Sequence, residues 1–240
     1  LMSLAVIPFH MHAASSSRAS IAPFSLPLLR LYHSLLLQQY RTGVSVPNCE
    51  PAAVVCTLFL SNSFSQADST LDEFLTVSPS SPTPHSVLHS LMEILLTRLL
   101  RLSPATLVIW TDEPEELDSA MQAEAESDSL RSASEGLFAS MLHHSPDLVA
   151  DILVNTISDS ERQLSCLSLL DSSTVSDELL FWEAVYVCCG LGSYLLSQSI
   201  CKDTFIYWLS NVVGKLLTTP FTPVAETPQI LHHRLLWLMS

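Results

Sequence analysis

Apolar residues recur at helical spacing along most of this chain. Between residues 85 and 102 they occupy positions 88, 91, 92, 95, 96, 99 and 102. This spacing places them on one face of an α-helix, and Arg98 and Arg101 near its end suit the negative end of the helix dipole. Similar spacing predicts helices over 24–41, 52–65, 130–144, 146–158, 177–197 and 203–218. The run 54–57 is β-branched enough to resemble a strand, but no partner strand follows it.

Prolines, serines and glycines separate these segments. The residues over 66–84 are polar and end in a Ser/Pro-rich run, which predicts a long loop. Pro146 directly follows the 130–144 segment, so we expect a tight connection to the next helix. Gly190 and Gly192 lie inside the 177–197 segment, where we expect them to permit close helix contact rather than to end the helix.

The helical segments form pairs that repeat every 35 to 50 residues or so, which is the range of HEAT and armadillo repeats. We therefore predict an all-α fold without a sheet: a right-handed α-solenoid of antiparallel helix pairs. Residues 1–84 are expected to form an N-terminal helical segment with a Ser/Pro-rich linker, and the first 22 show little periodicity. Residues 85–240 are expected to form HEAT-like repeats.

The charge of the chain is strongly acidic. Ten Lys and Arg residues against 24 Asp and Glu residues leave a net charge of −14, which repels nucleic-acid phosphates and anionic lipid. Basic proteins are therefore the expected partners. Nucleic acid and membrane are not expected as partners. Charged residues make up only 14% of the chain, so we expect faces that pack against neighbours.

The densest charge lies in an acidic segment over 112–128, which holds eight carboxylates and no basic residue. One interpretation is a solvated loop, and the alternative is a patch that faces a basic cargo protein. For the second interpretation, the candidate contact residues are Asp112, Glu113, Glu115, Glu116, Asp118, Glu124, Glu126 and Asp128.

No catalytic or cofactor motif is apparent. The chain has no phosphate loop, dinucleotide-binding glycine motif, nucleophile elbow or His-Glu-x-x-His zinc motif, so we predict neither an enzyme nor a cofactor. His85 and His89 would form at most half of a metal site, and no metal is predicted. Aromatic residues at helical spacing are expected to be core rather than a stacking platform; these are Trp182, Tyr186, Tyr194, Tyr207 and Trp208.

Cysteine usage and hydropathy indicate a cytosolic or nuclear protein. The cysteines lie mostly in apolar helical runs and are expected to be buried reduced thiols; they are Cys49, Cys56, Cys166, Cys188, Cys189 and Cys201. No signal peptide is recognised, and the apolar stretch 179–196 contains Glu183, which disfavours a membrane span. Because the apolar pattern is still running at residue 240, we expect a piece of a longer protein whose apolar end self-associates.

Four motifs occur in a suggestive order. The stretch 103–117 reads Ser-Pro-Ala-Thr-Leu, then Trp110-Thr-Asp-Glu-Pro-Glu-Glu-Leu; Glu183-Ala-Val-Tyr follows, then Phe205 with Trp208-Leu, then His233-Arg-Leu-Leu-Trp-Leu. Together they resemble the middle HEAT repeats of karyopherin-β nuclear transport receptors, with the importin-eleven-like branch the nearest. The resemblance covers about residues 85–240.

This resemblance implies a fragment of a receptor that carries protein cargo through the nuclear pore in a Ran-dependent cycle, located in the nucleus and the cytoplasm. It implies basic protein cargo and nuclear pore proteins as partners, with the Ran GTPase bound by repeats outside this chain. The alternative is a helical-repeat scaffold for protein–protein interaction that has no part in transport. The physical pattern supports both equally well.

Overall fold

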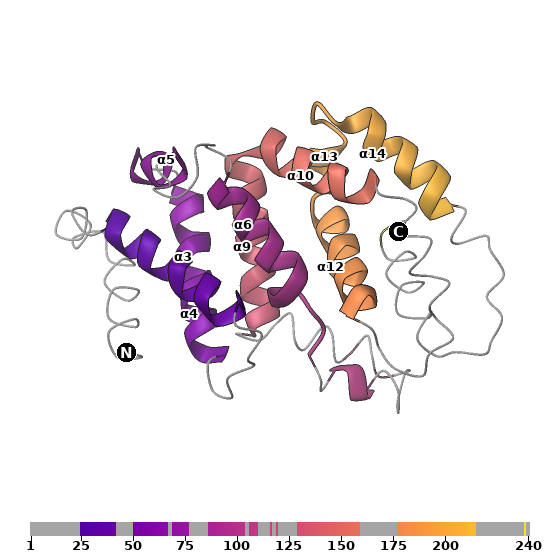
Figure 1. Ribbon diagram of the computed structural model, residues 1–240. Helices are drawn as coiled ribbons and strands as arrows, with labels where there is room; N and C mark the ends of the chain where they lie inside the picture. The colour runs from indigo at the N-terminus through magenta and orange to yellow at the C-terminus, as the bar shows by residue number, and fades with distance from the viewer. Residues whose placement is uncertain are drawn as a thin grey trace. The chain divides into compact units, whose positions relative to one another are not determined.

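The computed structural model describes residues 25–41, 50–66, 69–76, 86–103, 106–109, 129–158 and 177–214, together with residues 116, 119 and 238. All regular elements in these ranges are helices (Figure 1). In order they are α3 (Ser25–Arg41), α4 (Glu50–Gln66), α5 (Ser69–Thr76), α6 (Ser86–Ile94), η3 (Leu95–Leu99), α9 (Leu130–His144), α10 (Pro146–Ser158), α12 (Asp177–Leu191), α13 (Ser193–Leu196), α14 (Lys202–Trp208) and η6 (Leu209–Val213). The all-α prediction is confirmed for the described residues.

The chain divides into two compact units. Unit 1 comprises Leu1–Leu99 and Glu124–His144, and unit 2 comprises Leu100–Ala123 and Ser145–Ser240. The boundary expected between residues 84 and 85 lies outside the described residues, so the two predicted domains stay a prediction.

Several helix bounds agree with the sequence pattern. Helices α9 and α10 have the predicted ends, and Pro146 is the first residue of α10, where a missing N–H costs nothing. Helices α3 and α4 begin and end within two residues of their predicted positions. The β-branched run 54–57 lies inside α4 and is helical.

The loop expected over 66–84 is partly wrong, because α5 occupies Ser69–Thr76. Leu71 and Phe74, three residues apart, are both buried. The Phe74 ring also forms a T-shaped contact with the ring of His33 on α3, with the ring centroids 5.7 Å apart. Burial of these two side chains outweighs the modest helix propensity of the serine and threonines around them.

Two long helices change type before they end. The helix predicted over 85–102 is α-helical as α6 and then becomes the π-helix η3, whose Leu95, Leu96 and Leu99 are buried. The helix predicted over 203–218 similarly divides into α14 and the π-helix η6. A π-helix pairs residues five apart along the chain, and apolar spacing alone does not separate it from an α-helix.

The single helix expected over 177–197 is wrong at Gly192. Helix α12 ends at Leu191, Gly192 lies in a turn, and the four-residue α13 follows. Gly192 is buried, and its N–H still donates to the Cys188 carbonyl at 2.9 Å. Glycine has low helix propensity, so a turn is favourable here, whereas Gly190 stays inside α12 as expected.

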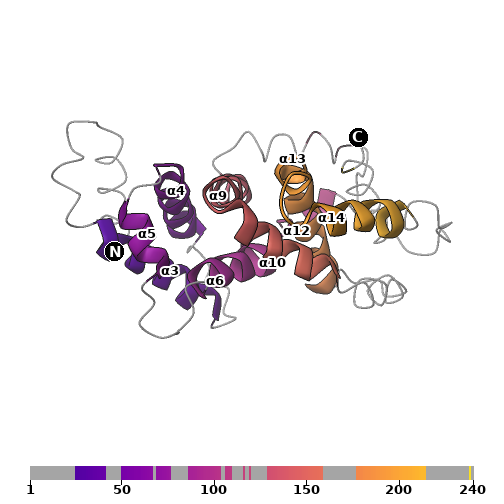
Figure 2. The same ribbon diagram turned by 90° about the horizontal axis from the view of Figure 1, so that it is seen from above.

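In unit 1, α4 packs against α9 in parallel. Ser140 of α9 lies within hydrogen-bond distance of Ser61 and Ser65 of α4, at 3.1 and 2.9 Å between hydroxyl oxygens. Further along both helices, the Phe64 ring meets the His144 ring edge to face. Residue numbers therefore increase in the same direction on both helices. Figure 2 shows α4 beside α9 and α3 beside α6.

In unit 2, α10 contacts α12, α13 and α14. The core between α12 and α14 is aromatic: ring centroids lie 6.2 Å apart for Trp182 and Tyr186, and 5.9 Å apart for Tyr186 and Trp208. The Phe205 ring stacks on Trp208 at 6.0 Å. All four rings are buried, so this cluster is the centre of unit 2 among its described residues.

Candidate functional site

The acidic segment is preceded by a short helical turn. Ser103 caps this turn, since its hydroxyl accepts the Thr106 N–H at 3.0 Å and its carbonyl accepts the Leu107 N–H at 3.0 Å. Residues 106–109 are helical, and Val108 among them is exposed. This turn ends three positions before Asp112 in the sequence.

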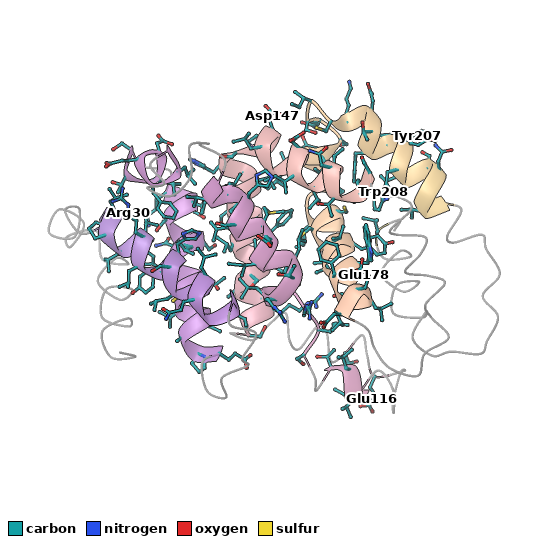
Figure 3. All side chains as sticks on the ribbon, viewed as in Figure 1. Arg30, Glu116, Asp147, Glu178, Tyr207 and Trp208 are labelled. Atoms are coloured by element: carbon teal, nitrogen blue, oxygen red, sulfur yellow. The ribbon has the colours of Figure 1, made fainter. Side chains whose placement is uncertain are left out.

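Of the eight candidate cargo contacts, the structure describes Glu116. Its side chain is exposed, as a residue that contacts a partner must be (Figure 3). The other seven, Asp112, Glu113, Glu115, Asp118, Glu124, Glu126 and Asp128, lie outside the described residues. The acidic cargo patch therefore stays a prediction.

An ion pair joins two parts of unit 2 that are distant along the chain. Arg101 Nη1 donates to Asp177 Oδ1 at 2.6 Å, which joins the bend after η3 to the first residue of α12. The Arg101 side chain is 18% exposed and that of Asp177 is 83% exposed. A carboxylate in the first turn of a helix also suits the helix dipole. The sequence placed Arg101 at a helix end, but it gave no signal for this partner, which is distant along the chain.

A second acidic surface was not anticipated. Asp147 and Asp151 are exposed and stand four residues apart on α10, so they share one helical face. Burial raises the pKa of the Cys201 thiol, and the nearby carboxylates of Asp151 and Asp147 raise it further. The turn before α14 therefore lies next to the acidic face of α10. The sequence shows that the two aspartates are four residues apart, but their proximity to Cys201 depends on the fold.

The described cysteines are free thiols. Cys56, Cys188 and Cys189 are buried, which confirms the prediction for these three, and Cys201 is half-buried. Burial raises the pKa of Cys56 to about 12, and it raises the pKa of Cys189 as well. Cys49 and Cys166 lie outside the described residues.

The described residues contain no group of three or more His, Cys, Asp or Glu side chains that could hold a metal ion. His89 is exposed, and His85 lies outside the described ranges. No helix in those ranges combines the length and the apolar character needed to span a bilayer.

The aromatic residues divide into two groups. Trp182, Tyr186 and Trp208 are buried, as predicted for core positions. The prediction is wrong for Tyr194 and Tyr207, which are exposed because they occupy the outward sides of α13 and α14. Helical spacing alone did not indicate which face of each helix would be covered.

No protein-family model matches this chain, and no curated protein or solved structure compared with it is significantly similar. In the part of the chain that the structure describes, all regular elements are helices, the chain divides into two compact units, and α10 carries an acidic face. Its function is therefore inferred from the packing and the charge of its own residues.

Proposed function

We propose that this chain is part of a karyopherin-β nuclear transport receptor that binds basic protein cargo in a Ran-dependent cycle. The order of the four motifs between residues 103 and 238 resembles that family. The observation that supports the proposal best is the pattern of helix contacts inside each unit.

In unit 1, α3 contacts both α4 and α6, while α9 contacts both α4 and η3. These are the neighbours expected of two stacked helix pairs, in which first helices contact first helices and second helices contact second helices. The parallel packing of α4 and α9 fits this arrangement, because equivalent helices of successive repeats run the same way. The pattern supports a HEAT-like solenoid of antiparallel pairs.

Unit 2 shows a similar relation. Helix α10 contacts α12, which would be its partner within a pair, and α14, which would be the first helix of the next pair. In unit 1, a hydrogen bond between His33 and Ser90, at 2.9 Å, joins α3 and α6, which would be the first helices of two successive pairs. Both units therefore support the same repeat plan.

The acidic charge supports basic cargo as the ligand class. A segment with eight carboxylates attracts Lys- and Arg-rich proteins, while exposed charges are screened over about 8 Å at physiological ionic strength. The attraction should therefore act mainly on the association rate and should weaken with salt. In the full receptor, Ran and the nuclear pore proteins would be the other partners, with Ran held outside this chain.

The cargo contact is tested by replacing all eight candidate carboxylates with Asn or Gln and titrating the affinity for a lysine-rich cargo peptide against salt. We expect affinity to fall about tenfold at low salt and the salt dependence to flatten, with helicity unchanged. The control neutralises Glu50, Glu73 and Glu93, which lie on helices outside the acidic segment. The loss of affinity per charge removed is then compared between the control and the eightfold variant. Equal loss per charge would show that the acidic segment is only a solvated connector.

The transport assignment is tested separately with the chain fused to a fluorescent protein and added to permeabilised cells. We expect accumulation at the nuclear rim, in contrast to the fluorescent protein alone. A fusion that binds the cargo peptide but shows no rim signal would instead favour the non-transport scaffold.

A further inference from the structure

Large apolar side chains are exposed between residues 191 and 207 of unit 2. The exposed fractions are 78% for Ile200, 48% for Ile206 and 65% for Tyr207, and Leu191 and Tyr194 nearby are exposed as well. Single exposed apolar residues are ordinary on soluble proteins, but a group of this kind indicates an interaction surface.

The exposed residues of α14 lie on a well-supported helix. Phe205 and Trp208 are buried on its inner side, where Trp208 contacts the Tyr186 ring of α12. Figure 3 shows Trp208 on the side of α14 toward α12 and Tyr207 on the opposite side. Ile206 and Tyr207 follow Asp203 by three and four residues, so these three exposed side chains form one outward stripe.

One carboxylate, that of Asp203, lies in this stripe, and two more lie near the N-terminal end of α14. Cys201 lies close enough to Asp147 and Asp151 for their charges to raise its pKa, and α10 contacts both α13 and α14. Leu148 and Ile200, which are both exposed, are the chain neighbours of Asp147 and Cys201. Lys202 is the only basic residue in α10, α13 and α14.

We propose that this α14 surface, formed by Ile200, Ile206, Tyr207, Asp147, Asp151 and Asp203, docks a basic amphipathic helix of a partner protein. The apolar face of such a helix would pack over Ile206 and Tyr207, and its Lys or Arg side chains would reach the aspartates. Tyrosine is a frequent anchor at the centre of interfaces, and the complementary charge fixes the orientation of the partner.

Charge also argues against the other occupants. A second copy of this chain would bring the same carboxylates to the contact and place like charges together. Nucleic acid and anionic membrane are repelled for the same reason. The α14 surface and the acidic segment 112–128 share no residue, and the inference does not depend on nuclear transport.

The test uses the whole chain and a designed peptide helix with leucines on one face and lysines on the other. We expect the double variant Ile206→Ser with Tyr207→Ser to bind the peptide about tenfold more weakly. The matched control, Leu31→Ser with Val108→Ser, removes two apolar side chains that are 49% and 58% exposed elsewhere, and it should bind as the parent does. All substituted positions are exposed, and circular dichroism checks that both variants fold.

The charge of the surface is tested by a triple variant, Asp147→Asn, Asp151→Asn and Asp203→Asn. It should lose affinity and salt dependence, whereas neutralising Glu50, Glu73 and Glu93 should change both less. A peptide with glutamates in place of the lysines should not bind. Equal losses in the matched variants, or equal binding of the glutamate peptide, would overturn the proposal.

Two other outcomes would reassign the surface and thereby also overturn the proposal. In the first outcome, the chain self-associates and the Ile206 and Tyr207 substitutions abolish this self-association. That result would identify a second copy as the occupant. The other is binding of a peptide of residues 228–240 with the same sensitivity to the variants. Failure of the α14 surface is distinguishable from failure of the cargo proposal, because the eightfold variant leaves α14 intact and the α14 variants leave residues 112–128 intact.

Discussion

Unit 1 and unit 2 differ in where their large apolar side chains lie. Among the described residues, Leu31 is the exposed large apolar residue of unit 1. The others belong to unit 2: Val108, Leu148, Leu191, Tyr194, Ile200, Ile206 and Tyr207. Both units have apolar cores, so the difference concerns their surfaces. Among the described residues, unit 2 therefore offers the larger exposed apolar surface to an additional partner.

The internal contacts of the two units differ as well. In unit 1 the seam between α4 and α9 is lined by Ser61, Ser65, Gly136 and Ser140, and the serine hydroxyls hydrogen-bond across it. Small side chains let two helices approach closely, and their hydrogen bonds specify the register. In unit 2, bulky rings fill the space between α12 and α14 instead. A ring cluster gains more from burial, because each aromatic side chain removes a large apolar area from water.

The largest effect is expected in the aromatic cluster of unit 2. Trp182→Ala removes a side chain that is only 1% exposed and leaves a cavity beside Tyr186, so the free energy of unfolding should fall by about 3 to 5 kcal/mol. Urea denaturation measures this loss. Trp182→Phe keeps a ring and should cost less, and Tyr207→Ala, on the exposed side of α14, should stay within about 0.5 kcal/mol. A loss below about 1 kcal/mol for Trp182→Ala would contradict the described packing.

Alkaline pH should weaken both units through their buried thiols. Burial raises the pKa of Cys56 in unit 1 to about 12 and raises the pKa of Cys189 in unit 2. The folded chain then holds these protons more tightly than the unfolded chain, whose thiols have a pKa of about 8.5. The stabilisation is therefore complete below about pH 8.5 and is lost as pH rises toward the pKa of the folded state.

Urea midpoints at pH 8 and pH 10.5 measure this loss. The variant Cys56→Ala should show a smaller decrease of the urea midpoint between the two pH values, whatever its absolute stability.

Mass spectrometry after alkylation of the folded chain should find Cys201 modified before Cys56, Cys188 and Cys189, since it is the half-buried thiol among the four. Equal rates at the four positions would contradict their different burial.

The sequence predicted helices well where local signals were strong. Pro146 marked the start of α10, and regular apolar spacing indicated α3 and α9. It failed at α5, because Leu71 and Phe74 are too few to outweigh the polar residues around them until the fold buries both. The sequence pattern also failed at Gly192 and at η3. At such positions packing decides whether a helix continues, ends or changes from α to π.

The functional surfaces were harder to predict than the helices. Counting carboxylates located the acidic segment, and Glu116 within it is exposed, but the other seven candidates lie outside the described residues. The α14 surface depends on which side of α14 the rest of unit 2 covers. Tyr207 and Trp208 are adjacent in sequence, and tertiary contacts such as that of Trp208 with Tyr186 decide which ring is buried. Such information comes from tertiary contacts, which periodicity does not contain.

The smallest effect is expected at the serine-lined seam of unit 1. A Cβ atom at Gly136 would lie 3.7 Å from the Ser61 hydroxyl oxygen, which is an ordinary van der Waals contact. Since glycine inside a helix is less favourable than alanine, Gly136→Ala should stabilise the chain by about 0.5 to 1 kcal/mol in urea denaturation. Gly136→Leu provides the contrast, because its larger side chain would push against α4 and should destabilise the chain. If Gly136→Ala were destabilising as well, α4 and α9 would have to lie closer together than described. The seam would then leave no room for a methyl group, and the contrast with the ring-filled core of unit 2 would disappear.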